Sequence, residues 1–172
     1  MNEILNGLKT RRSVRKYKTE QVPDRLLDAV LEAGTFAASG MNNQSCVLVA
    51  VRDKQTRDTL SRMNAAVMGT DRDPFYGAPC VIVVLGDPEK RTWVEDGSLV
   101  LGNLMSAAHS LGLGSCWIHR AREMFDTPEG KALLRAWGLP GSLRGIGNCI
   151  LGYADETPGA KPRAEGRIVK IG

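Results

Sequence analysis

Two basic segments at opposite ends of the sequence carry the groups best suited to bind a phosphate. Residues 11–15 read Arg-Arg-Ser-Val-Arg, and residues 161–163 read Lys-Pro-Arg. A phosphate monoester carries nearly two negative charges and three acceptor oxygens, which forked guanidiniums, an ammonium and a hydroxyl bind well. Together the two segments predict a phosphate clamp. The alternative for such a charge run is a solvated basic face, and the rest of the chain bears on that choice.

No glycine-rich phosphate loop accompanies these segments. The sequence contains no GxGxxG that opens a helix after a strand and no GxxxxGK[ST], and Gly145-Ile146-Gly147 is an isolated GxG. A Rossmann dinucleotide site and a P-loop are therefore disfavoured, and side chains are expected to hold the phosphate. Two further segments suit a flat ligand with a polar rim. Residues 112–118 run from a helix stop into a strand, and residues 39–44 offer small side chains and amides.

Length and composition predict one ordinary globular domain spanning residues 1–172. Hydrophobic residues make up 42 % and charged residues 24 % of the chain, which disfavours disorder. The longest apolar run, residues 81–85, is too short to cross a membrane, and the N-terminus has no signal-peptide core, so we expect a cytoplasmic protein. The net charge of +4 is mild, and with three Trp, three Tyr and three Phe the chain has little stacking capacity. We expect no nucleic-acid partner.

Cysteine and histidine usage predicts neither a disulfide framework nor a metal site. The four cysteines, none in a CxxC spacing, are Cys46, Cys80, Cys116 and Cys149. Each lies in or beside an apolar, strand-like stretch, so we interpret them as reduced core residues. The two histidines are His109 and His119, too few and too scattered for a zinc site. His109 is expected to be a hydrogen-bonded core or edge residue rather than a catalyst.

Hydrophobic periodicity alternates between helical and extended patterns, which predicts an α/β or α+β fold. Helices are expected at 4–8, at 24–37, through Leu60 and Met63, at 96–111 and at 128–137. Thr127 and Pro128 begin the last of these, and Gly138 ends it. Strands are expected at 81–85, after the helix stop within 112–118, at 147–153 and at 46–51, where a continuous apolar run predicts a fully buried strand.

The expected helix at 96–111 is apolar around nearly its whole circumference. Leucine, valine, methionine and alanine side chains face every direction, so the helix has to be covered on all sides. In a domain of this size it lies either at the centre of the fold or in a subunit interface. Ser98, Gly102 and Ser106, spaced four residues apart, would permit close approach of a partner helix. We therefore expect a dimer.

Five segments, taken in order, resemble the nitroreductase family: residues 11–15 (RRSVR), 37–45 (AASGMNNQS), 75–79 (FYGAP), 112–118 (GLGSCWI) and 161–163 (KPR). Their order and spacing cover nearly the whole chain. The resemblance implies an α+β fold of three layers, with a central, mostly antiparallel sheet flanked by helices. It also implies an intertwined homodimer with two FMN molecules at its interface. The implied activity is ping-pong transfer of hydride from NADH or NADPH through FMN to an electron-poor acceptor such as a nitroaromatic or a quinone.

The resemblance also implies cofactor-binding residues. Arg11, Ser13 and Arg15 match the motif that holds the FMN phosphate, ribityl chain and pyrimidine edge, with Arg12 contributing mainly through its backbone. The C-terminal phosphate contacts match Lys161 and Arg163.

Two further segments match contacts to the rest of the cofactor. The segment that reaches the flavin from the other subunit corresponds to Ser39, Gly40, Asn42 and Gln44. The segment that lines the ring corresponds to Trp117, Ile118, His119 and Arg120, and a backbone N–H near His119 is expected to meet the flavin N5. No side chain is expected to be an obligatory acid, base or nucleophile, since the flavin carries the chemistry.

Several departures from the family pattern leave alternatives open. Ser45-Cys46 stands where many relatives have Pro-Trp, and His119 stands where a carboxylate is common. The His119 side chain either supplies a proton to the substrate or contributes only its backbone. The pyrimidine contact is open among three residues, namely Asn64, Asp71 and Asp73. Phe75 and Tyr76 either wall the substrate channel or belong to the core. The alternative functions are flavin reduction, dehalogenation, oxidation, and flavin binding without turnover.

Overall fold

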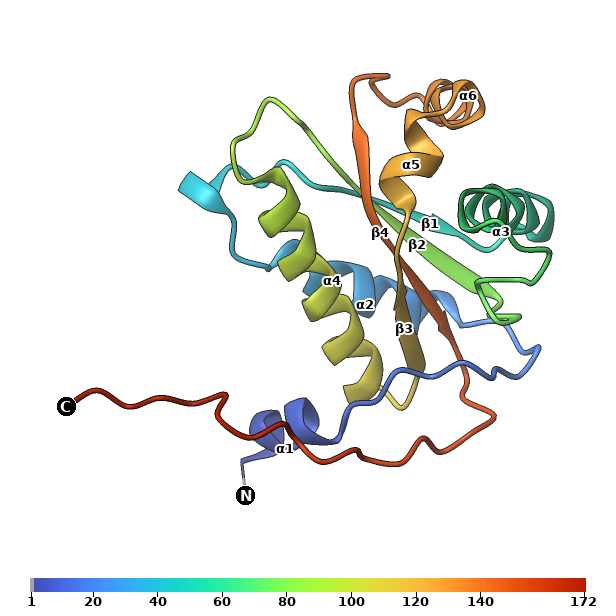
Figure 1. Cartoon of the computed structure of the whole chain (residues 1–172). Helices are drawn as coiled ribbons and strands as arrows, with labels where there is room; N and C mark the ends of the chain where they lie inside the picture. Colours follow the sequence, from blue (N-terminus) through green and yellow to red (C-terminus); the bar gives the residue numbers. More distant parts are fainter. Residues whose placement is uncertain (1) are drawn as a thin grey trace.

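The computed structural model describes residues 2–172. Figure 1 follows the chain through its helices and strands, with the sheet between them. The helices are α1 (Glu3–Thr10), α2 (Asp24–Thr35), α3 (Lys54–Met68), α4 (Trp93–Ser110), α5 (Ala121–Asp126) and α6 (Pro128–Ala136), with a short 3-10 turn at Gly40–Asn42. The strands are β1 (Val47–Val51), β2 (Cys80–Gly86), β3 (Gly114–Ile118) and β4 (Arg144–Gly152).

The four strands form one sheet in the order β1-β2-β4-β3, and every neighbouring pair is antiparallel. Helices α2 and α4 cover one face, while α3, α5 and α6 cover the other (Figure 1). Side chains alternate between the faces of a strand, so β2 supplies both cores. Val81 and Val83 pack under α3, α5 and α6, whereas Ile82 and Val84 pack under α2 and α4. The predicted three-layer α+β fold is confirmed.

Strand β1 is less buried than its apolar sequence predicts. It pairs only with β2 and so forms one edge of the sheet. Val47, Leu48 and Val49 are only partly buried, Ala50 is exposed, and Val51 alone is buried. The prediction of a fully buried strand was wrong, because an edge strand lacks a neighbour on one side. Its side chains still reach both cores, since Val49 packs with one and Leu48 with the other.

Several element boundaries also differ from the sequence-based expectation. Helix α2 ends at Thr35, so Ala37 lies beyond it, and α4 begins at Trp93, three residues early. Strand β4 also begins early, at Arg144. It contains a bulge at Ile146, between the two glycines of the GxG motif, which pair with Leu85 and Val84. The six-residue helix α5 was not predicted, since so short a segment carries little periodicity.

Helix α4 is covered by its own chain on one side only. Val100, Leu101, Leu104 and Ala108 are buried against the sheet. On the outer side, Leu99 is 51 % exposed. The helix is therefore not covered on all sides by its own chain. No helix in the described part of the chain has both the length and the apolar character of a membrane span.

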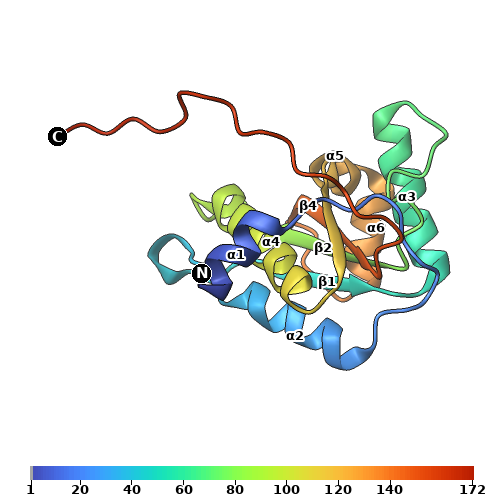
Figure 2. The ribbon, with the colours of Figure 1, turned by 90° about the horizontal axis from the view of Figure 1, so that it is seen from below.

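The chain after β4 has no regular structure and runs back past α1. Figures 1 and 2 show this C-terminal segment leaving the body of the molecule, passing α1 in the view of Figure 1 and set apart from it in the view of Figure 2. Its last apolar side chains, Ile168, Val169 and Ile171, are between 76 % and 92 % exposed. Residues 8–15 and residues 158–163 nevertheless border one open hollow, which is the site described next.

Candidate functional site

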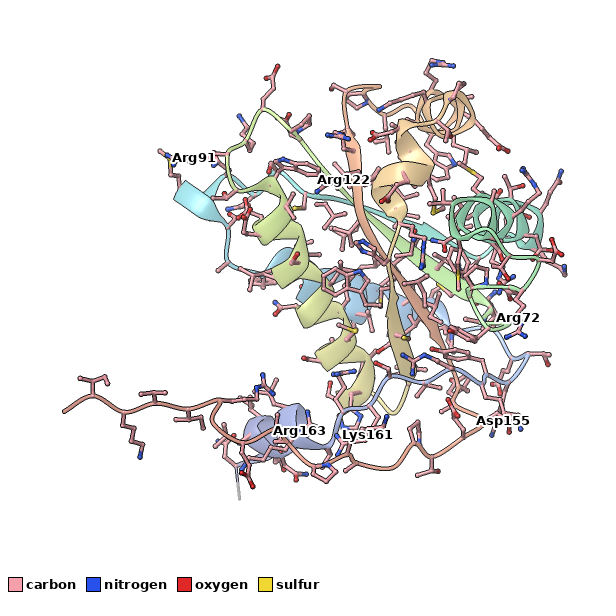
Figure 3. All side chains as sticks on the ribbon, in the orientation of Figure 1. Arg72, Arg91, Arg122, Asp155, Lys161 and Arg163 are labelled. Carbon is pink, nitrogen blue, oxygen red and sulfur yellow. The ribbon has the colours of Figure 1, made fainter. Side chains whose placement is uncertain are left out.

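The structure brings the two basic segments together around one open hollow. Its volume is about 920 Å³, and Figure 3 shows Lys161 and Arg163 beside α1. The lining comprises Leu8, Lys9, Arg11, Arg12, Ser13, Arg15, residues 158–160, Lys161 and Arg163. All the basic residues and the serine of the two clamp segments therefore line the same space, whereas Val14 and Pro162 do not. This placement argues against an unstructured basic surface.

Backbone pairing to the sheet positions the N-terminal half of the hollow. Ser13 forms a parallel bridge with Ser115 of β3, and the Val14 N–H donates to the Ser115 carbonyl at 3.0 Å. Val14 is 6 % exposed and packs against β3. Because neighbouring side chains alternate in extended chain, burying Val14 turns Ser13 and Arg15 the other way. Further along, the Lys18 N–H donates to the Tyr153 carbonyl at 2.9 Å, which ties this segment to the C-terminal one.

The cations of the hollow are left without acidic partners. None of the ion pairs among residues 2–172 involves Arg11, Arg15, Lys161 or Arg163. The Arg11 Nη1 atom is buried and has no hydrogen-bond partner. A buried, unpaired guanidinium nitrogen is costly unless a ligand satisfies it. The hollow therefore fits an anion that brings its own acceptor oxygens.

Arg12 differs from its neighbours in where its side chain goes. Its Nη1 donates to the carbonyls of Lys9 at 2.7 Å and Arg11 at 2.8 Å, so the guanidinium folds back over the C-terminal end of α1. These carbonyls lack helical partners, and a cation there is favourable. This position agrees with a ligand contact through the Arg12 backbone only.

The segment at 39–44 is a tight turn with strained backbone. Met41, Asn42 and Gln44 have φ angles of 53°, 54° and 47°, a region that residues with side chains rarely adopt. Internal bonds hold the turn: the Gln44 N–H donates to Ser39 Oγ at 3.1 Å, and Gln44 Nε2 donates to Asn42 Oδ1 at 2.9 Å. Strain of this kind persists at binding sites when the surroundings enforce it.

A buried carboxylate that sequence reasoning missed anchors this turn. Asp96, in the first turn of α4, is only 3 % exposed. Its oxygens accept the Gly40 N–H at 2.9 Å and the Thr92 hydroxyl at 3.1 Å. A Cβ on Gly40 would lie 2.2 Å from Thr92 Oγ1. Gly40 is thus needed because the turn packs directly against the start of α4. Sequence reasoning missed Asp96 because an acid in the first turn of a helix is common and gives no further signal.

The anchored turn and the basic hollow lie at opposite ends of α4. Asp96 is in the first turn, whereas His109, in the last, lies 2.9 Å through its Nε2 from the Thr10 hydroxyl of α1. Thirteen residues at 1.5 Å each separate the two ends by about 20 Å. One copy of the chain therefore does not bring both predicted halves of the site together. His109 is hydrogen-bonded at the domain edge, as predicted.

The predicted ring-lining segment ends β3. Trp117 is 38 % exposed and lies over β4, where a Cβ on Gly147 would be 2.5 Å from its Nε1. Ile118 is buried in the core, so only its backbone can face a ligand. His119 is exposed, and its carbonyl accepts a hydrogen bond at 2.7 Å from Asn64 Nδ2. Asn64 is fully buried, which fixes the backbone at the strand end.

Comparison with known proteins identifies the family. A model described as the nitroreductase family matches residues 8–71 and 65–153. The chain belongs to the nitroreductase family. A crystal structure of a nitroreductase with bound FMN from Bacteroides fragilis is 31 % identical, with a TM-score of 0.92 and 100 % of both chains covered.

Two further relatives support the assignment of this chain to the nitroreductase family. The structure of a nitroreductase with bound FMN from Desulfitobacterium hafniense is 27 % identical, with a TM-score of 0.90 and 100 % of both chains covered. The curated protein named FMN reductase [NAD(P)H] from Bacillus subtilis is 26 % identical, over 95 % of this chain and 70 % of its own length.

The three open candidates for a pyrimidine contact differ in how far they are already bonded. Asn64 holds the His119 carbonyl. Asp73 accepts from the Ser61 hydroxyl, the Arg57 guanidinium and the N–H groups of Phe75 and Gly77. Burial opposes ionisation of Asp73, but these donors outweigh it and hold its pKa below the ordinary value. Asp71 is exposed.

The other predicted residues are placed as follows. Phe75 is fully buried in the core, so it does not wall a channel. Tyr76 is 43 % exposed and has a φ of 53°, and its ring centroid lies 6.0 Å from the Arg15 Cζ. All four cysteines are free thiols, and burial raises the pKa of Cys80 to about 12. Among residues 2–172, no cluster of His, Cys, Asp or Glu is arranged to hold a metal ion.

Proposed function

We propose that this chain is an FMN-dependent oxidoreductase that oxidises NADH or NADPH and reduces an electron-poor small molecule, such as a nitroaromatic or a quinone. Family membership supports the proposal, as do the FMN bound in two solved relatives and the name of the Bacillus subtilis relative, FMN reductase [NAD(P)H]. The observation that carries it is the hollow in which both ends of the sequence present unpaired cations.

The residues of the hollow fit the anionic end of FMN. Arg11 offers a buried Nη1 that lacks an acceptor, and Lys161 and Arg163 face it from the C-terminal segment. In this proposal, Lys161 and Arg163 bind the phosphate with Arg11, while Ser13 and Arg15 hold the ribityl chain and pyrimidine edge. Each charge-assisted hydrogen bond would contribute about 1.5–3 kcal/mol.

Bound FMN would supply the redox chemistry, accepting hydride from NADH or NADPH in one half-reaction and releasing it to the acceptor in the other. The residues of the chain itself would hold the flavin in position and shield it from solvent. Trp117 and the backbone of Ile118 and His119 would line the ring, with an N–H near His119 directed to N5. The buried Asn64 amide holds that backbone in place through the His119 carbonyl. No side chain has to act as an acid or base.

We further propose that the working unit is a homodimer. The turn at 39–44 and the basic hollow lie about 20 Å apart along α4 in one chain, so a second copy has to supply one of them to each site. A complementation experiment tests this. Arg11→Ala and a bulky replacement such as Gly40→Leu would each impair both sites of a homodimer. Co-expressed and purified through two different tags, the heterodimer should regain one intact site and its FMN. Recovery of neither would contradict shared sites.

Spectroscopy of the purified protein tests the proposed activity. A yellow protein with an FMN absorption peak should bleach when NADH or NADPH is added without oxygen. Adding a nitroarene or a quinone should then restore the colour. Colour that NAD(P)H does not bleach would instead indicate flavin binding without turnover.

A second candidate function is reduction of free flavin, which the name of the Bacillus subtilis relative favours. It uses the same site, so the two candidates differ only in the acceptor. Comparing kcat/KM for free FMN, a quinone and a nitroarene in the presence of saturating NADH distinguishes them. A free-flavin value well above the other two would favour flavin reduction.

A further inference from the structure

The turn between β3 and α5 contains an arginine in a backbone conformation that suits glycine. Strand β3 ends at Ile118 and α5 begins at Ala121, so two residues reverse the chain. The second of them, Arg120, has φ 76° and ψ 10°. Glycine adopts this left-handed conformation without steric cost, whereas an arginine has to be forced into it.

The surroundings leave this turn no room to relax. On one side, the fully buried Asn64 amide holds the His119 carbonyl. On the other, α5 lies so close to β4 that a Cβ on Gly145 would be 2.2 Å from the Ala121 carbonyl oxygen. The backbone conformation of Arg120 is therefore imposed by packing, and glycine would be the residue that stabilises it best.

The Arg120 side chain forms no hydrogen bond or ion pair with the described residues that would offset this strain. None of the side-chain hydrogen bonds or ion pairs found across residues 2–172 involves it, and it is only partly buried. Backbone strain without a structural return is a recognised mark of a functional residue. The segment it follows, Trp117 to His119, is the one proposed to line the flavin ring.

The neighbourhood of Arg120 is rich in arginine. The Cζ of Arg122 lies 5.0 Å and that of Arg144 5.8 Å from the centroid of the Trp93 ring, and Figure 3 shows Arg122 between α4 and α5. Arg144 is paired with Asp126. The remaining acid of α5 is Glu123, which is exposed. Among residues 2–172, neither Arg120 nor Arg122 has an ion-pair partner, so two guanidiniums beside this turn are free to attract an anion.

We propose that Arg120 binds a phosphate group of the nicotinamide co-substrate and so sets its KM. This inference rests on the proposed function. NADH carries a diphosphate and NADPH an additional 2′-phosphate, and a guanidinium binds either through paired, charge-assisted hydrogen bonds. Arg120 is thus a specificity residue for the hydride donor; the FMN phosphate belongs to the hollow at the other basic site.

The test uses Arg120→Gly in the FMN-loaded protein, because glycine removes the side chain and relieves the backbone. The melting temperature of the apoprotein should be unchanged or higher. The KM for NADH should rise about ten- to hundredfold, the loss expected for one charge-assisted contact. The KM for 1-benzyl-1,4-dihydronicotinamide, a hydride donor that has no phosphate, should rise far less than the KM for NADH. Arg120→Lys should recover part of the NADH affinity.

The matched control is Arg72→Ala, which removes one positive charge from an exposed site at a distance from this turn (Figure 3). Its KM for NADH should stay at the wild-type value. An equal rise in KM for NADH and NADPH would assign the contact to the diphosphate, and a larger rise for NADPH to the 2′-phosphate. An unchanged KM in Arg120→Gly, or an equal loss with the phosphate-free donor, would overturn the inference. Failure of the wild-type protein to oxidise NAD(P)H would instead refute the proposed function.

Discussion

Replacing Gly40 with alanine tests whether the start of α4 holds the turn at 39–44 in place. The new Cβ would lie 2.2 Å from Thr92 Oγ1 and 3.1 Å from both the Cβ and the Cγ2 of Thr92. The Thr92 hydroxyl cannot simply rotate away, since it donates to the buried Asp96 carboxylate. The turn has to move instead, and the Gly40 N–H then leaves Asp96.

The size of the effect follows from these contacts. Overpacking costs about 1–3 kcal/mol, and losing a hydrogen bond to a carboxylate costs about 1.5–3 kcal/mol. Since a shift of the turn relieves the overpacking by giving up the hydrogen bond, only one of the two costs is incurred, and Gly40→Ala should lower the free energy of unfolding by about 1–3 kcal/mol. Thr92→Ala removes the nearest obstructing atom and loses one hydrogen bond to the Asp96 carboxylate, for about 1.5–3 kcal/mol. The double variant should therefore be more stable than the sum of the single losses by about 1–2 kcal/mol.

Urea unfolding of the apoprotein measures these free energies, and FMN titration measures the consequence for the site. Gly40→Ala should weaken FMN binding, and the added Thr92→Ala should restore part of it. Gly141→Ala is the matched control, since a Cβ there meets nothing within 4 Å. If Gly40→Ala is as harmless as the control, or if the two losses simply add, the contact with Thr92 does not constrain the turn.

Three further predictions follow from other parts of the structure. Hydrogen bonds hold the pKa of Asp73 below its ordinary value of about 3.9, so its stabilisation is complete above about pH 4 and is lost as pH falls through the lowered pKa. Urea titrations of Asp73→Asn should thus differ from wild type by a constant amount from about pH 5 to 8, and the difference should shrink progressively as pH falls below about 4 through the lowered pKa. Leu99→Asp, on the uncovered side of α4, should shift the sedimenting species to monomer; a monomeric wild type would contradict the interface. Burial and the Asp96 charge raise the pKa of Cys46 to about 11. Iodoacetamide should therefore alkylate Cys46 at pH 8 more slowly than it alkylates a thiol of ordinary pKa. Removing the Asp96 charge in Asp96→Asn should speed this reaction.

Much of the fold was predictable because its elements carry strong local signals. The apolar run at 81–85 had to be a buried strand, and the Thr127-Pro128 pair had to begin a helix, as the structure confirms. The edge position of β1 was not predictable, since a continuous apolar run does not say how many neighbours a strand has. Helix α5 escaped notice because six residues make less than two turns.

The candidate site divides in the same way. Charge and residue type marked Arg11 and Arg163 in sequence, and the structure places both at one hollow. Asp96 gave no such signal, because its role depends on Gly40 lying against the start of α4, a contact between residues far apart in sequence. The positive φ of Arg120 was equally hidden, since nothing local to an arginine predicts a left-handed turn.

The central claim is that the hollow lined by both ends of the chain binds the phosphate group of FMN. The most direct test compares two flavins. FMN and riboflavin, which differ only by that group, are titrated into the wild-type apoprotein and into Arg11→Ala and Arg163→Ala. Each substitution should weaken FMN binding by about 1.5–3 kcal/mol, roughly tenfold to a hundredfold, by removing a charge-assisted contact. Riboflavin affinity should hardly change. An equal loss for riboflavin, or no loss for FMN, would show that these residues do not bind the phosphate.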